Sequence, residues 1–208
     1  MGYGILLLVV VLLLVTPWLP GRVRPIHFLQ NFFIKFLHVW KVRPLDQDVC
    51  RDNLFAFDDA MRSLGLTFWL SEGTALGCVR DGAIIPWDDD VDVGMSCHDL
   101  KKFTREGVPK LIEEGFTLSL VYNGGTFFGF LRNGEKLDVD FACEGKRCQA
   151  CRTSHAMCDT CDSVVHYTQT TRPVNFLGRD FLVPGDNYFE YLYGPHWKTP
   201  DRKKDLVL

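Results

Sequence analysis

Four carboxylates fall within five consecutive positions of the chain, in the stretch IIPWDDDVDVG that runs from Ile84 to Gly94. Successive side chains of an extended strand point to opposite faces. We therefore expect one acidic face and one apolar face, with Asp88, Asp90 and Asp92 on the first and Asp89, Val91 and Val93 on the second. Such crowding of like charges opposes folding unless a cation lies among them.

A second stretch, Glu135 to Ala142, repeats this alternation. Asp138 and Asp140 are expected on one face, and the apolar side chains of Leu137, Val139 and Phe141 on the other. Asn133-Gly134 directly before it predicts a hairpin turn, which supports a strand within a sheet. If the two acidic strands are neighbours, their carboxylates converge on one divalent ion, and oxygen ligands of this kind suit Mg²⁺ or Mn²⁺.

A solvated acidic loop is the alternative interpretation, and a single Asp-x-Asp motif is more often surface than site. The flanking residues Val91 and Val93 indicate a half-buried strand instead. Because burying carboxylates without a cation costs several kcal/mol, the sequence favours a metal site over a solvated loop.

The elements that must position these side chains come just before them in the chain. Apolar residues recur at helical spacing from Asp46 to Leu64, which predicts an amphipathic helix, and Leu66 to Leu70 predicts a short strand. Ser71 to Thr74 is expected to form a tight turn before a helix or turn from Ala75 to Val79. Gly73 would let backbone amides approach a phosphate at this helix N-terminus, although such a pair is often only a turn.

The N-terminal segment, residues 1–21, contains a continuous apolar run that ends at Val15. A spanning helix needs roughly 17 to 25 residues, so the run suits either a signal anchor or a signal peptide, and an uncleaved anchor is favoured. Arg22 and Arg24 follow the run, and the positive-inside tendency would keep that side cytosolic. Residues 22–45 are expected to form a juxtamembrane stalk helix, and residues 46–208 a catalytic domain.

Two closely spaced C-x-x-C pairs lie in a cysteine-rich insertion, residues 143–166. Cys148, Cys151, Cys158 and Cys161 match the spacing of a structural Zn²⁺ site, which is favoured over disulfides, although an oxidising compartment would favour the latter. Cys143 could pair elsewhere or replace one of the four. Cys50, Cys78 and Cys97 are expected to be buried small apolar residues.

The overall charge argues against nucleic acid as a partner. The chain has 208 residues and a formal net charge of −3, without a long run of Lys and Arg. Once the apolar leader is set aside, its length suits one domain with a substantial core.

The residues from Phe68 to Arg80, with Gly82 and the stretch from Ile85 to Asp92, resemble the hallmark block of the LicD/fukutin-type transferases. Residues between Phe176 and Pro200 are similar to the closing segment of that family. The resemblance implies a nucleotidyltransferase-like α/β fold, a mixed sheet flanked by helices. It also implies transfer of a phospho-alcohol, such as ribitol phosphate or phosphocholine, from a CDP-activated donor to a glycan hydroxyl, with CMP leaving.

The resemblance further implies roles for individual residues. Asp90 and Asp92 would hold the metal with Asp140 or Asp138, and Gly73 and Thr74 would line the phosphate site. Asp88 would hold metal or act as a base. Arg80 would contact the diphosphate, with a structural salt bridge as an equal alternative.

Family members in animals are usually anchored with the catalytic domain in the Golgi lumen. A Golgi or ER membrane location is therefore expected here, or secretion if the leader is cleaved. Two rival interpretations stay open: an inactive binding or chaperone-like module that keeps the fold, and a scaffold whose cysteine loop is the functional part.

Overall fold

The computed structural model describes residues 45–122, 125–143 and 170–205. The predicted leader, the predicted stalk up to residue 44 and the C-x-x-C pairs at Cys148, Cys151, Cys158 and Cys161 lie outside these residues. The anchor and the zinc site therefore stay predictions. Within the described part of the chain, no helix is both long enough and apolar enough to cross a membrane.

A five-stranded sheet forms the centre of the fold, with the strand order β1-β2-β5-β4-β3. Its strands are β1 (Phe68–Leu70), β2 (Val91–Ser96), β3 (Thr117–Tyr122), β4 (Phe127–Arg132) and β5 (Glu135–Ala142). Strands β2 and β5 are parallel, and the other pairs are antiparallel. The expected mixed sheet is confirmed.

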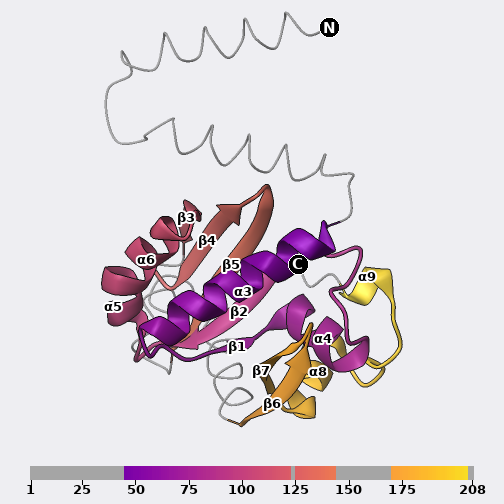
Figure 1. Cartoon of the computed structure of the whole chain (residues 1–208). Coiled ribbons are helices and arrows are strands. Elements are labelled where there is room, and N and C mark those ends of the chain that lie inside the picture. The colour runs from indigo at the N-terminus through magenta and orange to yellow at the C-terminus, as the bar shows by residue number, and fades with distance from the viewer. Residues whose placement is uncertain (1–44, 123–124, 144–169, 206–208) are drawn as a thin grey trace, which may run out of the picture. The chain divides into compact units, whose positions relative to one another are not determined.

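Helices and a small hairpin surround this sheet (Figure 1). The helices are α3 (Gln47–Ser63), α4 (Glu72–Arg80), α5 (Leu100–Lys102), the π-helical η2 (Phe103–Gly107), α6 (Val108–Glu113), α8 (Asp186–Tyr193) and α9 (Arg202–Asp205). The hairpin consists of β6 (Thr171–Phe176) and β7 (Arg179–Pro184). Figure 1 shows α3 lying across the sheet, while α4, α8 and the hairpin gather on its β1 side.

Helix α3 matches the predicted helix closely. The side chain of Asp46 accepts a hydrogen bond from the backbone N–H of Val49, which caps the N-terminus. Gly65, with φ +62°, follows the C-terminus, a conformation that favours glycine. The helix buries Leu54, Phe57 and Met61 against the sheet.

The apolar face of β2 and β5 forms the core beneath this helix. Val93 pairs with Val139 in register, and both are fully buried. Phe103 makes edge-to-face contacts with Phe128 and Phe141 in the same core. Asn133 and Gly134 both have positive φ, as a tight hairpin turn between β4 and β5 requires. The predicted strand, its apolar face and its turn are therefore confirmed.

Two local expectations are wrong. Asp88, Asp89 and Asp90 do not belong to a strand, because β2 begins only at Val91. They form a turn and loop in which the N–H of Asp88 donates to the Ile85 carbonyl, at 3.1 Å. Helix α4 begins at Glu72 rather than at Ala75, so Gly73 and Thr74 lie in its first turn.

One disulfide joins two of the cysteines that the structure describes. Cys97, expected to be a buried small apolar residue, instead bonds to Cys143, with a Cα–Cα distance of 4.9 Å. The reason is the parallel pairing of β2 and β5, which places the residues after both strands side by side. Cys143 therefore pairs outside the C-x-x-C group, one of the two possibilities left open. Cys50 and Cys78 are buried, as expected, and neither takes part in the disulfide.

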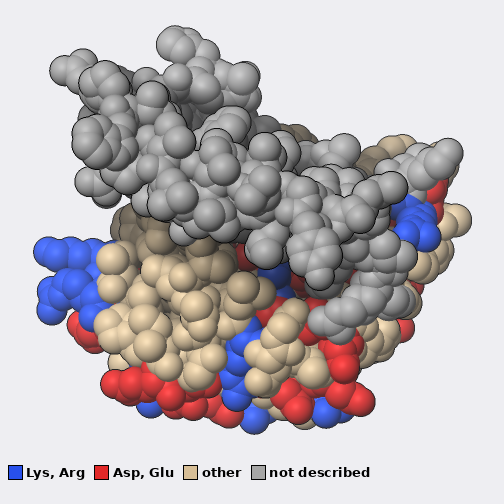
Figure 2. Space-filling model, turned by 90° about the horizontal axis from the view of Figure 1, so that it is seen from above, with Lys and Arg blue, Asp and Glu red and all other residues tan. Residues whose placement is uncertain are grey.

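Ion pairs attach the β6–β7 hairpin to α3. Arg179 of β7 pairs with Asp58 and Asp59 of α3 and covers the ring of Phe55, 4.2 Å from its centroid. On the face seen in Figure 2, basic and acidic side chains of the described residues lie interspersed, in keeping with the nearly neutral net charge.

Loss of the Cys97–Cys143 disulfide is predicted to destabilise the fold. The bond closes a segment with a sequence separation of 46, and Cys97→Ser should lower the free energy of unfolding by about 4 kcal/mol in the chain-entropy model. Urea unfolding measures this difference. Peptide mapping under non-reducing conditions checks the connectivity, and a disulfide joining Cys97 to any other cysteine would contradict the prediction.

Candidate functional site

The parallel pairing of β2 and β5 brings the predicted acidic side chains together. Asp92 lies directly opposite Asp138 in the register, and Asp140 lies opposite Gly94 on the same face. The loop of Asp88, Asp89 and Asp90 leads directly into β2. Carboxyl oxygens of these three loop residues all lie within 4.8 Å of one another. Two strands and one loop therefore supply a single acidic cluster.

Asp88 is the member of this cluster with the clearest unmet bonding capacity. Its Oδ2 is buried and has no hydrogen-bond partner in the described part of the chain. Its carboxylate lies against Gly73, where a Cβ atom would overlap Oδ2. Gly73 therefore serves close packing at this point, a role that its backbone amide can combine with phosphate binding.

Thr74 links α4 to the first strand of the site. Its Oγ1 accepts a hydrogen bond from the backbone N–H of Asp92, at 2.8 Å. This bond fixes where β2 starts, and so where the Asp92 side chain points. The proposed contact of Thr74 with phosphate stays a prediction.

Lys136 supplies positive charge to the cluster. Its Nζ lies 3.1 Å from Asp89 Oδ2 and 3.0 Å from Asp90 Oδ2, and its side chain is 19% exposed. Lys136 lies on β5, two residues before Asp138 and on the same face. Sequence reasoning had assigned it no role, although its spacing from Asp138 placed it on the acidic face.

Glu72 is a further acidic member that sequence reasoning missed. It opens α4 with φ +43°, and its backbone N–H donates to the Tyr188 hydroxyl at 3.0 Å. A non-glycine residue in this region of backbone space costs of order 1 to 3 kcal/mol unless its surroundings hold it there. Tyr188 lies 116 residues later in the chain, so no local pattern predicts its contact with Glu72. The one sign of a role for Glu72 in the sequence is its acidic side chain within the hallmark block.

The carboxyl groups of the cluster have raised pKa values. Burial is the main cause and the neighbouring Asp90 charge contributes, together with Asp140 in the case of Glu72, so that the pKa of Asp88, Asp138 and Glu72 is raised to about 7 in each case. Burial and the same neighbour also raise the pKa of Asp92 well above its ordinary value. Burial raises the pKa of Asp140, and its backbone hydrogen bond partly opposes the shift.

Two tyrosines of α8 close the cluster from the C-terminal side. Tyr188 is 2% exposed, and burial followed by the Glu72 charge raises its pKa. The Tyr193 hydroxyl is buried and has no hydrogen-bond partner among the described residues. Burial, Tyr188 and the charges of Glu72 and Asp92 raise its pKa. Tyr188 and Tyr193 thus lie beside the acidic cluster, in which Asp140 is exposed.

Arg80 pairs with two carboxylates in the structure, and its proposed contact with a diphosphate stays a prediction. Its side chain is 3% exposed, and its guanidinium pairs with Asp205 at 3.0 Å and with Asp81 at 2.8 Å. The structural salt bridge, the alternative interpretation from the sequence, is therefore what the structure contains. It ties the C-terminal end of α4 to α9.

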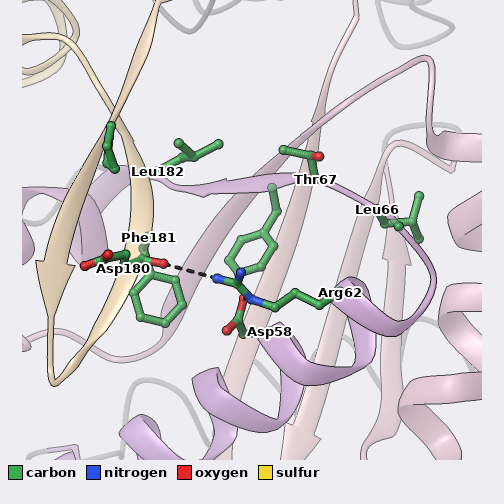
Figure 3. Close-up of a pocket in the computed structure, with 10 residues that line it drawn as sticks. Asp58, Arg62, Leu66, Thr67, Asp180, Phe181 and Leu182 are labelled. Carbon is green, nitrogen blue, oxygen red and sulfur yellow. Dashed lines mark hydrogen bonds and ion pairs between the residues drawn. The ribbon is translucent and has the colours of Figure 1, made fainter.

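A pocket of about 520 Å³ lies beside the end of α3, β1 and the β6–β7 hairpin (Figure 3). Arg62 crosses it, with its Nε 2.7 Å from Asp58 Oδ1 and its Nη2 donating to the Asp180 carbonyl at 3.2 Å. None of the predicted site residues lines this pocket, so it is not part of the acidic cluster.

Comparison with known families gives one match over more than half of the chain. The family described as LicD/FKTN/FKRP, nucleotidyltransferase domain, matches residues 65–186. The match contains the acidic loop, both acidic strands and the first turn of α4.

Curated relatives match over parts of their length. The mouse protein named ribitol-5-phosphate transferase FKTN is 29% identical over 169 residues, which cover 70% of this chain and 32% of the relative. The human protein named ribitol 5-phosphate transferase FKRP is 32% identical over 84 residues, covering 38% and 17%. An uncharacterised protein of Rickettsia prowazekii is 37% identical over 54 residues, covering 26% and 20%. The chain thus spans about a third of the length of the FKTN relative.

Among solved structures, the antibiotic-resistance factor ANT(2'')-Ia in solution is similar with a TM-score of 0.48 and 15% identity. The likeness covers 73% of this chain and 76% of that one. A crystal structure of ANT(2'')-Ia with adenylyl-2''-tobramycin gives a TM-score of 0.42 and 17% identity, over 71% and 79%.

The raised carboxyl pKa values predict that the metal-free protein loses stability as pH rises. The unfolded chain releases these protons near pH 4, whereas Asp88, Asp138 and Glu72 keep them to about pH 7 in the folded state. The stabilisation is therefore complete at low pH and is lost as pH rises towards 7. Urea unfolding in a chelator at pH 5, 6 and 7 measures it. A rise in stability across this range would contradict the prediction.

Gly73→Ala is predicted to weaken Mn²⁺ binding by about tenfold, because the new Cβ displaces the Asp88 carboxylate. Gly185→Ala is the matched control, since a Cβ there meets its nearest atom at 3.9 Å. Electron paramagnetic resonance titration of Mn²⁺ measures the affinity. Equal affinity in both variants would show that Asp88 does not contribute to the site.

Proposed function

Because the chain belongs to the LicD/FKTN/FKRP nucleotidyltransferase domain family, we propose that it is a metal-dependent transferase acting on a CDP-activated phospho-alcohol. The transferred group is of the ribitol phosphate or phosphocholine type, and the acceptor is a glycan hydroxyl. The observation that carries the proposal is the placement of Asp92 opposite Asp138 in parallel strands, with the loop of Asp88 to Asp90 beside them.

The residues present fit a divalent metal ion. Carboxylate oxygens are the ligands that Mg²⁺ and Mn²⁺ prefer, and the buried Asp88 Oδ2 shows that bonding capacity in this cluster is unmet among the described residues. Asp90, Asp92 and Asp138 would hold it. Asp138 is preferred to Asp140 as the third ligand, because it pairs with Asp92 and also hydrogen-bonds Asp90. When bound, the ion supplies neutralisation of phosphoryl charge and polarisation of the attacking hydroxyl.

The backbone of α4 suits the donor phosphates. The amides of Gly73 and Thr74 lie in the first turn of a nine-residue helix, where the helix dipole favours an anion. Because the Glu72 N–H is already bonded to Tyr188, these two amides are the donors that we assign to the phosphate.

Asp88 is the residue that we assign to proton transfer. In the metal-free protein, burial followed by the Asp90 charge raises the pKa of Asp88 to about 7, and its carboxylate would accept the proton of a glycan hydroxyl. The in-line attack of that hydroxyl on the distal phosphorus forms the new P–O bond and breaks the P–O bond to CMP, which leaves. Tyr188 and Tyr193 lie beside the acidic side chains from α8.

A luminal location in the Golgi or ER, reached through the N-terminal leader, is part of the proposal. The Cys97–Cys143 disulfide supports it, because disulfides persist in oxidising compartments and are rare in the cytosol. The membrane anchor itself is inferred from residues 1–21 of the sequence.

Asp92→Asn is predicted to abolish metal-dependent transfer by the full chain. Loss of a ligand that neutralises phosphoryl charge should lower the rate of CMP release by about 100-fold or more. CMP release from CDP-ribitol and CDP-choline, with glycan acceptors, is measured in Mg²⁺, in Mn²⁺ and in a chelator. Asp48→Asn is the control, because the Asp48 side chain is 83% exposed and pairs only with Arg51 in the described ion pairs.

Three outcomes separate the alternatives. Metal-dependent release that fails in Asp92→Asn supports the transferase. Donor binding without release by the wild-type chain would favour the inactive binding module. Release that is unchanged by a chelator would remove the metal from the proposal.

A further inference from the structure

We propose that Lys136 is a positioning residue of the acidic site, whose ammonium holds Asp90 in the metal-free protein and yields it to the divalent ion. The inference rests on the proposed function, because it needs a metal ion at Asp90. It assigns a role to a basic side chain that the family resemblance and the acidic pattern left unused.

The geometry gives Lys136 two partners in one loop. Its Nζ bonds Asp89 Oδ2 and Asp90 Oδ2 at nearly equal distances, 3.1 and 3.0 Å. These bonds join β5 to a loop 46 and 47 residues earlier in the chain. The loop is not part of the sheet, so its carboxylates depend on side-chain contacts for their orientation.

The charge of the cluster explains why a cation is needed there. Seven carboxyl groups face one another or adjoin this site: Glu72, Asp88, Asp89, Asp90, Asp92, Asp138 and Asp140. The cation in both ion pairs described for the cluster is Lys136. One ammonium offsets only part of this charge, so the cluster keeps a strong attraction for a divalent ion.

Lys136 and the metal ion compete for the same ligand. The ammonium lies on Asp90 Oδ2, while the Asp138 carboxyl also contacts Asp90. An ion held between Asp90, Asp92 and Asp138 would stand next to the ammonium, and two cations at such a distance repel each other. The ion therefore takes Asp90 from Lys136, which keeps its second partner, Asp89.

A purely structural salt bridge makes the opposite prediction. If Lys136 only supported the loop, its removal would disorder Asp90 and weaken metal binding. If Lys136 competes with the ion, its removal tightens metal binding while it destabilises the metal-free protein. The two roles thus differ in the sign of one measured quantity.

The first test is Mn²⁺ affinity of the full chain carrying Lys136→Met, measured by electron paramagnetic resonance titration without donor. We expect the dissociation constant to fall by about tenfold, and the unfolding temperature in a chelator to fall as well. Lys110→Met is the matched control, because Lys110 lies on α6 and pairs with Glu113 and Glu114. It makes the same change in net charge and should leave the Mn²⁺ affinity within about twofold.

The second test uses the unchanged protein and so does not depend on the folding of a variant. Acylation of lysine amines, read by mass spectrometry of peptides, should increase at Lys136 when Mn²⁺ is added. The reactivity of Lys110 should stay the same.

The outcomes distinguish this inference from the proposed function. Absence of Mn²⁺ binding to the wild-type chain would overturn the metal requirement and the competition together. Mn²⁺ binding by the wild type that is unchanged or weaker in Lys136→Met would overturn the role of Lys136 alone. If that variant does not fold, unchanged acylation of Lys136 on Mn²⁺ addition overturns it.

Discussion

The parallel pairing of β2 with β5 is the constraint on which the site depends. Val93 and Val139 are buried side by side on one face, so the residues between the apolar positions must point to the other. A slip of one residue would turn Asp92 or Asp138 into the apolar core and valine to the acidic face. The hydrophobic core thus determines which side chains form the acidic face. The Cys97–Cys143 disulfide, placed just after both strands, reinforces the same register.

The acidic face lowers the stability of the folded protein, because like charges lie close together in a partly buried position. Burial makes the charged form of these carboxyl groups costly, as the raised pKa values of Asp88 and Asp138 show. Residues selected only for stability would not leave Asp88 Oδ2 buried without a partner. A local conflict of this kind is typical of functional sites, where binding of a ligand relieves it.

The sequence predicted the parts of the fold that depend on short-range periodicity. The helix from Asp46, the alternation of Leu137, Val139 and Phe141, and the Asn133-Gly134 turn all follow from local rules. The prediction of an alternating strand was wrong at Asp88 to Asp90, because these residues follow a turn that starts at Ile85. The acidic residues that the structure brings together were thus identified from residue type, although part of the assumed geometry was wrong.

The remaining features depend on partners far away in the chain, which periodicity does not reveal. Glu72 is held by Tyr188, Arg80 by Asp205 and Cys97 by Cys143. These pairings can be predicted only when the three-dimensional arrangement of the sheet and the helices is known. The role of Arg80 in particular could not be decided, since a buried arginine serves a structural carboxylate and a phosphate equally well.

Two of these pairings hold α4 at its ends and explain how a short helix can position a ligand. Tyr188 bonds the Glu72 N–H at the N-terminus, and Asp205 pairs with Arg80 at the C-terminus. Tyr188 and Asp205 both lie beyond residue 186, where the family match ends. The chemistry-bearing residues are thus within the matched segment, while their rigidity comes partly from outside it. Because a displacement of about 1 Å is enough to impair a site of the kind proposed, the C-terminal helices belong to the same functional unit as the acidic cluster.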